Sequence, residues 1–362
     1  MRILLVRPTA SGGLAAHVDH ELALLTAAGQ EVAEAPVRIR ERPHPLADLR
    51  TVRTLRSVLV ASPAPVVLHA HGLRAGALSA LAVRGRRGRL VVTLHNRTVG
   101  SRAGRAVGAV LLRILARTAD TVLAVSPDLA EAARRAGAGD VRHAVIPAPA
   151  PADPVSADPV SADREPSAPG AAAGSAARPA ADGGEGIAPL EILVIARLAP
   201  QKGLPDLLDA AAVLRDGPPV RIRVAGDGPL HEELSARIRA EHLPVELLGR
   251  RDDVPALLAA ADLVVSAARW EGQPVSLQEA LRAGRAIVAT DAGGTRWVTG
   301  EAAALVPVGA PAALAAAISS LAAPAARRAA EAASRRRARD LPTEEHLLAQ
   351  LDEVLVAGAR GW

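Results

Sequence analysis

Short apolar runs alternate with amphipathic stretches along most of the chain, and this alternation predicts its fold. A helical pattern follows each run, and the first such pattern spans 14–28. Strands that alternate with helices indicate parallel sheets covered on both faces, so we expect an α/β fold. The apolar runs that read as buried strands are 2–6, 66–70, 90–95, 121–125, 191–196, 220–225, 245–248, 262–266 and 286–290.

One segment interrupts the alternation and divides the chain. It is rich in Pro, Ala and Gly, contains the tandem DPVSA at 153–157 and 158–162, and cannot bury a core, so it reads as a flexible linker. We expect two Rossmann-like doubly wound domains that face each other across a cleft, where such sheets bind ligands. The later part should contain an Ala-rich helix over 310–338 and a final amphipathic helix over 343–358. The expected parts are a first domain over 1–147, the linker over 148–189, a second domain over 190–340 and a terminal segment over 341–362.

Composition excludes several classes of protein. The chain has 362 residues, enough for two domains, and no cysteine, which excludes disulfides and thiolate chemistry. It has neither a long uninterrupted apolar run nor the h-region of a signal peptide, so we expect a cytoplasmic protein.

The basic residues concentrate in the first part of the chain. Residues 1–150 contain 21 Arg and 10 acidic residues, whereas the remainder is net negative. This asymmetry favours an anionic partner for the first domain. The absence of Phe and Tyr argues against single-stranded nucleic acid, which stacks on aromatic rings. An anionic membrane surface on the inner face of the membrane, or a phosphate-bearing acceptor, fits better.

The segment 102–117 sharpens this expectation. On a helical wheel its arginines gather on one side and most of its apolar residues on the other. Two interpretations remain open: a helix lying on anionic lipid, or an ordinary surface helix packed on the sheet. The arginines are Arg102, Arg105, Arg113 and Arg117, and the apolar residues are Val107, Val110, Leu111, Ile114 and Leu115.

The strongest chemical pattern is Glu271-Gly-Gln-Pro-Val-Ser-Leu-Gln-Glu279. Glu271 lies in a loop after a predicted strand, and Glu279 lies in the helix that follows. Two carboxylates can bind two separate diols, and the backbone N–H groups at a helix start can hold an anion. One helix start therefore offers contacts to both a sugar and a phosphate. The residues expected at this site besides Glu271 are Gly272, Gln273, Pro274, Val275 and Glu279.

Two cations follow the first strand of the second domain. They are Arg197 and Lys202, and Lys202 is the only lysine in the chain. Five residues apart at the carboxyl end of a strand, they can hold a diphosphate and neutralise its charge as it leaves, which a magnesium ion does in other enzymes. Since no Asp-x-Asp offers an obvious metal site, we expect no metal.

Weaker signals complete the pocket. Gly12 and Gly13 follow the first strand and open a helix, where small residues let backbone amides approach a phosphate. Asp291-Ala-Gly-Gly294 follows a strand near the same pocket. Arg251 and Asp253 follow the strand 245–248, where a nucleobase could bind; Asp253 would accept guanine N–H groups or cap the next helix.

These motifs resemble the family-4 retaining glycosyltransferases of the GT-B fold (glycosyl transferases group 1). The glutamate pair matches the family's Glu-x7-Glu motif, the two cations match its Arg-x4-Lys motif, and Gly12-Gly13 matches its first-domain glycine loop. His95 matches a histidine that faces the sugar or the acceptor in these enzymes, and His69-Ala-His71 resembles another first-domain segment. The terminal helix is similar to one that crosses back onto the first domain.

The resemblance implies transfer of a sugar from a UDP- or GDP-sugar to a hydroxyl of a lipid, glycan or small molecule. The configuration would be retained, with no metal and no cofactor besides the donor substrate, in cell-envelope or glycoconjugate synthesis. The first domain would bind the acceptor and the second the nucleotide sugar. The residues implied to be catalytic are Glu271, Arg197, Lys202 and His95.

Two departures from the family pattern leave alternatives open. Gln273 stands where the family usually has an aromatic residue, and Ile146-Pro-Ala-Pro-Ala replaces its Asn-Gly-Val-Asp. The first could alter the choice of sugar, and the second the hinge. A degenerate, non-catalytic partner subunit or a nucleotide-sugar epimerase therefore remains an alternative.

Overall fold

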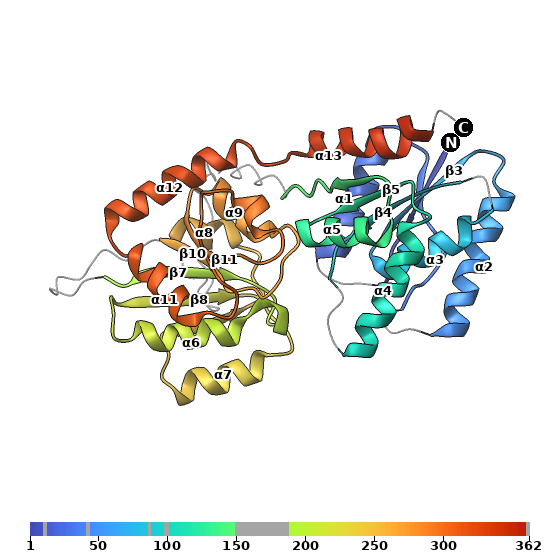
Figure 1. Ribbon diagram of the computed structural model, residues 1–362. Coiled ribbons are helices and arrows are strands. Elements are labelled where there is room, and N and C mark those ends of the chain that lie inside the picture. Colours follow the sequence, from blue (N-terminus) through green and yellow to red (C-terminus); the bar gives the residue numbers. More distant parts are fainter. Residues whose placement is uncertain (10–12, 41–43, 86–87, 98–100, 149–187, 360–362) are drawn as a thin grey trace, which may run out of the picture.

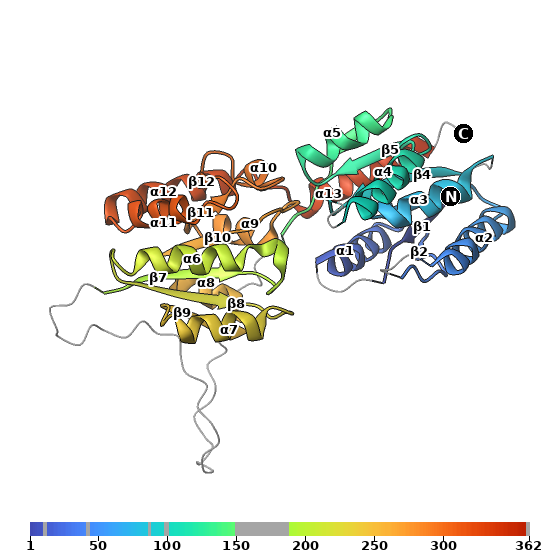
Figure 2. The ribbon, with the colours of Figure 1, turned by 60° about the horizontal axis from the view of Figure 1, so that its bottom comes forward.

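The computed structural model describes residues 1–9, 13–40, 44–85, 88–97, 101–148 and 188–359. It contains two six-stranded sheets, each flanked by its own helices (Figures 1 and 2). Every strand pair in both sheets is parallel, which confirms the predicted α/β fold with two doubly wound domains. The expected linker over 148–189 lies, apart from its ends, outside the described residues.

The first sheet has the order β2-β1-β3-β4-β5-β6, so the strand order reverses between β1 and β3. Its central strand β3 (Val66–His71) is buried at every residue, as expected for an apolar strand covered on both faces. The other strands are β1 (Arg2–Val6), β2 (Val32–Glu34), β4 (Arg89–Leu94), β5 (Thr121–Ala124) and β6 (Val141–His143). The helices are α1 (Gly13–Ala27), α2 (Pro45–Ala61), α3 (Leu73–Val83), α4 (Arg102–Ala116) and α5 (Pro127–Ala136).

The second sheet has the order β12-β11-β10-β7-β8-β9, and its order reverses between β7 and β10. Its strands are β7 (Leu190–Ile195), β8 (Val220–Ala225), β9 (Val245–Gly249), β10 (Leu263–Ser266), β11 (Ala286–Thr290) and β12 (Ala304–Val306). Its helices are the 3-10 turn Pro200–Lys202, α6 (Leu204–Leu214), α7 (His231–Ala240), α8 (Val254–Ala260), α9 (Val275–Arg282), α10 (Thr295–Thr299), α11 (Pro311–Ser320) and α12 (Pro324–Ala338).

The structure corrects the sequence-based expectations in three places. The expected helix 310–338 is two helices, because Pro324 lacks the N–H that would continue α11 and instead occupies the first turn of α12. Three edge strands, β2, β6 and β12, were not expected from the sequence. Each has only three residues, too few to show the alternation of apolar and polar positions that marks a strand. The final helix 343–358 is α-helical only over α13 (Glu344–Leu351), and a π-helical and a 3-10 turn follow.

The C-terminal part of the chain connects the two domains. Helix α12 lies on the second domain, whereas α13 lies along the first, near α1 (Figures 1 and 2). Gln350 Nε2 donates to the His143 carbonyl at 2.8 Å, and Arg89 Nε donates to the Val354 carbonyl at 3.0 Å. Among the described residues, no helix combines the length and the apolar character needed to cross a membrane.

Gln278 links the two domains at the hinge. Its side chain is fully buried, its Oε1 accepts from the Ala148 N–H at 3.0 Å, and its Nε2 donates to the Ile146 carbonyl at 2.8 Å. Gln278→Leu should lower the free energy of unfolding by about 1–3 kcal/mol, because both backbone groups lose their partner. Urea denaturation measures this, with the exposed Gln201→Leu as a control expected to change stability little. Equal stability of the two variants would contradict this role of Gln278.

Candidate active site

The topology of the second sheet places the two main motifs together. Its strand order reverses between β7 and β10, and ligands of doubly wound sheets bind outside the carboxyl ends of the strands at such a point. Arg197 and Lys202 follow β7, and Glu271 follows β10. Gly203 lets the two loops approach, because a Cβ there would lie 1.9 Å from the Ala267 carbonyl oxygen.

Lys202 and Glu271 form an ion pair at this point. Lys202 Nζ donates to Glu271 Oε1, and the two side chains are 23% and 13% exposed. Arg197 is exposed, and its guanidinium makes no ion pair with any described residue. One cation of the predicted pair thus neutralises Glu271, while the other faces solvent and can take an anion.

Helix α9 (Val275–Arg282) begins shortly after Glu271, with Pro274 as its N-cap residue. The N–H groups of Val275 and Ser276 have no backbone acceptor among the described residues, whereas those of Leu277 and Gln278 donate to the Pro274 carbonyl; the first two are therefore suited to an anion. Glu279 lies on the same helix and is half-buried; burial raises the pKa of its carboxyl group, and Arg282 opposes this shift. The structure therefore places Glu279 on α9, the helix that follows Glu271 in the chain.

Two glycines allow the domains to approach each other closely here. A Cβ at Gly272 would lie 2.6 Å from Val125 Cγ2 and 3.6 Å from the carbonyl oxygen of His95. A Cβ at Gly294 would lie 2.0 Å from the Gly272 carbonyl oxygen and 2.9 Å from that of Val125. Trp270 Nε1 also donates to Asp128 across the interface at 3.0 Å. His95 of the first domain is therefore close to the loop that contains Glu271.

Gln273 makes contacts that the sequence did not predict. Its Nε2 donates to the Ala144 carbonyl and lies 3.0 Å from His143 Nε2. In this arrangement the side chain joins the second domain to the end of β6. The expected effect of Gln273 on the choice of sugar remains a prediction.

The structure places the remaining predicted residues as follows. Arg251 and Asp253 bind each other through two hydrogen bonds, of 2.8 and 2.6 Å, and the neighbouring guanidinium lowers the pKa of the Asp253 carboxyl group. Asp253 is the N-cap residue of α8 without a side-chain capping bond. Gly13 is exposed at the start of α1, and Gly12 lies outside the described residues.

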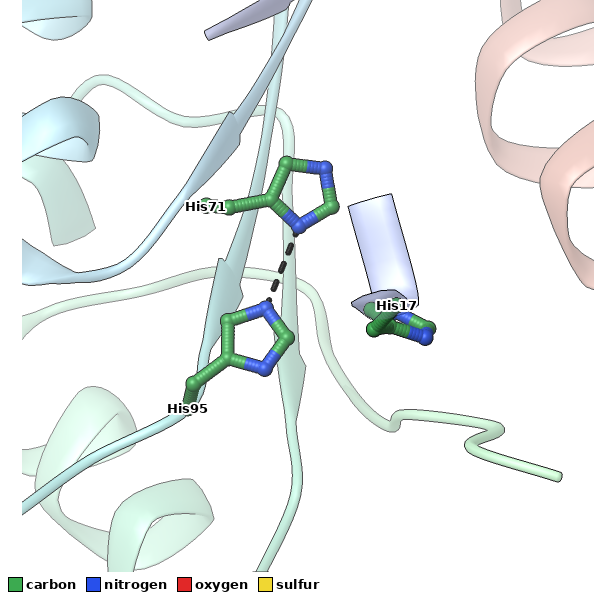
Figure 3. Close-up of side chains that lie close together, drawn as sticks. All are labelled: His17, His71 and His95. Atoms are coloured by element: carbon green, nitrogen blue, oxygen red, sulfur yellow. Dashed lines mark hydrogen bonds between the residues drawn. The ribbon is translucent and has the colours of Figure 1, made fainter. Parts of the chain in front are cut away.

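His95 belongs to a buried histidine cluster in the first domain, which consists of His17, Glu21, His69, His71 and His95. Figure 3 shows three of its members, His17, His71 and His95. His71 Nδ1 lies 3.1 Å from His95 Nε2, and His17 Nε2 lies 2.8 Å from Glu21 Oε1. Burial lowers the pKa of His71 to about 4 and holds that of His95 well below 6.5, so both rings are neutral near pH 7.

Sequence reasoning missed two members of this cluster. His17 and Glu21 are four residues apart on α1, a spacing that places them on one helix face. Glu21 lies on the buried face of α1 with Val18 and Leu25, and it is 1% exposed. An acidic residue at a position where the helix pattern requires an apolar one was the signal available in the sequence.

The histidine cluster should make the stability of the first domain depend on pH. The unfolded chain protonates His71 near 6.5, whereas the folded chain does so only near 4, so between these values the unfolded state binds more protons. Stability should therefore fall as pH falls through this window, by on the order of 3 kcal/mol for this residue. Urea unfolding between pH 7 and 4.5, with a chelator present, measures the slope. His71→Gln should flatten it and the exposed His231→Gln should not; equal slopes would contradict the assignment.

A cavity of about 660 Å³ lies on the hinge side of the interface. It is lined by residues from β6, α10 and α13, among them His143, Trp297 and Gln350, and it also reaches Gln273. Neither Glu271 nor Lys202 lines it. The candidate site is therefore the pair Lys202–Glu271 at the strand ends, and not this cavity.

Comparisons with known proteins match both domains of the chain to family models. A family model described as glycosyl transferase 4-like domain matches residues 4–149, and one described as glycosyl transferases group 1 matches residues 189–323. No curated protein sequence matches the chain.

Several solved structures share the fold over the full chain. Sucrose-phosphate synthase from Thermosynechococcus elongatus has a TM-score of 0.75 at 17% identity and covers 100% of both chains. A trehalose-phosphate synthase (UDP-forming) from Burkholderia vietnamiensis has a TM-score of 0.72 at 14% identity, covering 100% of this chain and 99% of its own. Anabaena HepE in complex with UDP has a TM-score of 0.69 at 20% identity, covering 99% of this chain and 100% of its own. At such identities the likeness establishes the fold.

Proposed function

This chain belongs to the glycosyl transferases of group 1, with the GT-B fold, and we propose that it transfers a sugar from a nucleotide diphosphate to an acceptor hydroxyl, with retained configuration and without a metal on the diphosphate. One observation carries the proposal. At the reversal point of the second sheet, Lys202 from the loop after β7 pairs with Glu271 from the loop after β10, shortly before α9 begins, and the exposed Arg197 follows the same β7.

The ion pair suggests how the donor engages. A diphosphate bound between Arg197 and Lys202 carries more negative charge than one carboxylate, so it competes with Glu271 for the ammonium group. Glu271 is then free to position the sugar and to stabilise positive charge at the anomeric carbon. Glu279, whose raised pKa reflects burial, accepts hydrogen bonds from the ribose hydroxyls.

The proposed reaction is a front-face displacement. The bond from the anomeric carbon to the diphosphate oxygen breaks, and a bond from that carbon to the acceptor oxygen forms on the same face. The acceptor proton moves to the leaving diphosphate oxygen, whose charge Arg197 and Lys202 stabilise. Neutral His95 orients a hydroxyl of the sugar or the acceptor from the first domain.

We propose a UDP-sugar as the donor. Solved HepE structures contain UDP and UDP-glucose, and HepE shares the fold of this chain. Both oxygens of the Asp253 carboxylate already accept from Arg251, which weakens the argument that this carboxylate reads guanine. A GDP-sugar is the alternative to be measured beside it.

The acceptor is proposed to be anionic or lipid-linked, with α4 contacting an anionic membrane. On this helix Val107 and Val110 are 51% and 57% exposed beside exposed Arg102 and Arg105, whereas Leu115 is buried against the domain.

Co-sedimentation with vesicles tests the membrane contact. We expect the chain to bind anionic vesicles, and the double variant Arg102→Gln/Arg105→Gln to lose at least about half of this binding, since each basic residue near the surface contributes about 1 kcal/mol. Equal binding to neutral vesicles would contradict the charge argument.

Donor binding and turnover test the proposed function. Thermal unfolding with UDP- and GDP-sugars, with a chelator present, should show stabilisation by UDP-sugars only. Product analysis should then show a glycoside with retained configuration and free UDP. An epimerised donor would identify an epimerase, and no stabilisation by any donor would identify a non-catalytic subunit; either result would overturn the proposal.

A further inference from the structure

The histidine cluster contains three buried polar atoms that have no hydrogen-bond partner. They are Glu21 Oε2, His69 Nδ1 and His71 Nε2, and the side chains that carry them are at most 2% exposed. Glu21 Oε2 lies 3.3 Å from His69 Nδ1 and 3.1 Å from His71 Nε2, but not in hydrogen-bond geometry. Burying polar atoms without a hydrogen bond is costly, most of all for a carboxylate oxygen, even with two imidazole rings beside it.

The other polar atom of each of these side chains does have a partner. Glu21 Oε1 lies 2.8 Å from His17 Nε2, and His69 Nε2 lies 2.8 Å from Thr93 Oγ1. His71 Nδ1 lies 3.1 Å from His95 Nε2. This is the arrangement found around metal ligands, in which one atom binds the ion and the other is held by an outer hydrogen bond that fixes the ring.

We infer that Glu21, His69 and His71 form a binding site for one divalent transition-metal ion of the zinc class. One ligand atom from each of the three side chains lies within 4.8 Å of the other two. Bonds of about 2.0–2.1 Å in a tetrahedron separate neighbouring ligand atoms by about 3.3 Å, which the two measured separations match. Two imidazoles and one carboxylate are a ligand set that zinc accepts, and the ion would neutralise the buried carboxylate.

A second group of three, His17, His71 and His95, also brings its ring nitrogens within 4.8 Å (Figure 3). Its ring nitrogens already have polar partners, since His17 Nε2 lies 2.8 Å from Glu21 Oε1 and His71 Nδ1 lies 3.1 Å from His95 Nε2. The group containing Glu21 is therefore the one we assign.

The site lies where the order of the first sheet reverses. His69 and His71 are on β3, and Glu21 is on α1, which follows β1. A metal on His71 Nε2 places the proton of that ring on Nδ1, which then donates to His95 Nε2. The proton of neutral His95 is then on Nδ1, so the ion would fix its tautomer from a distance. This role is separate from donor binding at Lys202.

Metal content and cobalt spectroscopy of the full chain test the inference. Protein stripped with a chelator should bind one equivalent of Zn²⁺, and Co²⁺ should give d–d absorption bands typical of low-coordinate sites. Glu21→Gln should weaken Zn²⁺ binding by at least about 100-fold, and Thr93→Val, which removes only the outer hydrogen bond, by about 10- to 100-fold. The exposed His231→Gln should bind as the unaltered chain does.

Circular dichroism of each metal-free variant shows whether it is folded. If Glu21→Gln does not fold, Thr93→Val still tests the inference. Binding of less than one equivalent by the unaltered chain, or unchanged affinity in both Glu21→Gln and Thr93→Val, would overturn the inference. Neither result bears on donor binding, which is measured with a chelator present. The two proposals can therefore fail independently.

Discussion

Lys202→Ala is expected to lower kcat/KM for sugar transfer by about 10²- to 10³-fold, the loss typical when one group that stabilises developing charge is removed. The same variant should lose most of the thermal stabilisation by the donor. The physical reason is that Lys202 is the cation closest to Glu271 at the end of β7, where the diphosphate is proposed to leave. Steady-state kinetics and thermal unfolding with and without donor measure the two effects.

A matched control separates this role from general charge. Arg269 belongs to the same region, is exposed, and pairs with Asp206 at 2.9 Å. Arg269→Ala removes one positive charge near the loop, yet it should change kcat/KM less than about threefold, because the charge of Arg269 is already taken up by Asp206 and its exposed guanidinium is largely screened by solvent. Equal losses in both variants would show that net charge is what matters, and not the position of Lys202.

Lys202→Ala also leaves Glu271 without its partner, so part of its effect could arise from altered stability. Lys202→Ala/Glu271→Gln removes the unpaired charge and should restore the melting temperature without the donor. It should not restore activity, since both groups act on the reacting centre. Recovery of activity in the double variant would contradict the proposed roles.

The sequence predicted the fold because its apolar runs are long and regular. The strand 2–6 and the strand 286–290 have the predicted bounds, since each is a continuous apolar run that is buried over most or all of its length. The edge strand β12 could not be predicted, because its three residues have no period and their pairing depends on β11. The break between α11 and α12 was available in the sequence at Pro324 and was overlooked.

The residues of the candidate active site could be predicted from the sequence where they directly follow a strand. Arg197, Lys202 and Glu271 were identified because each follows a predicted strand, and the strand order then brings two of them into contact. Gln273 could not be placed, because its partners at the end of β6 come from the other domain. No local pattern contains such a contact.

The histidine cluster shows the same limit in the first domain. His69 and His71 could be seen to share a strand, but not to face Glu21, which precedes them by 48 and 50 positions. Their meeting depends on the packing of α1 over the sheet. Glu21 was missed because its contacts with His69 and His71 arise only when α1 packs on the sheet, and the sequence does not show that packing.

Gly294→Ala is expected to lower kcat/KM by about 100-fold or more, the loss typical when reacting groups are displaced by about 1 Å, although the residue has no side chain to contact a substrate. Its φ of −93° is accessible to alanine, so the effect is purely steric. The new Cβ would lie 2.0 Å from the Gly272 carbonyl oxygen and 2.9 Å from that of Val125, and both are backbone atoms that cannot rotate away. The loop holding Glu271 must therefore shift, or the first domain must move away from it.

Two measurements distinguish these consequences. If the domains separate, small-angle X-ray scattering should show an increased radius of gyration; if only the loop shifts, the radius stays constant and donor stabilisation falls. In either case stability should decrease by about 1–3 kcal/mol, as for other overpacked positions. Gly139→Ala, where a Cβ meets nothing within 4 Å, should retain activity, shape and stability. If Gly294→Ala behaves as Gly139→Ala does, the close approach of His95 to the Glu271 loop is not required for transfer, and His95 loses its proposed place in the reaction.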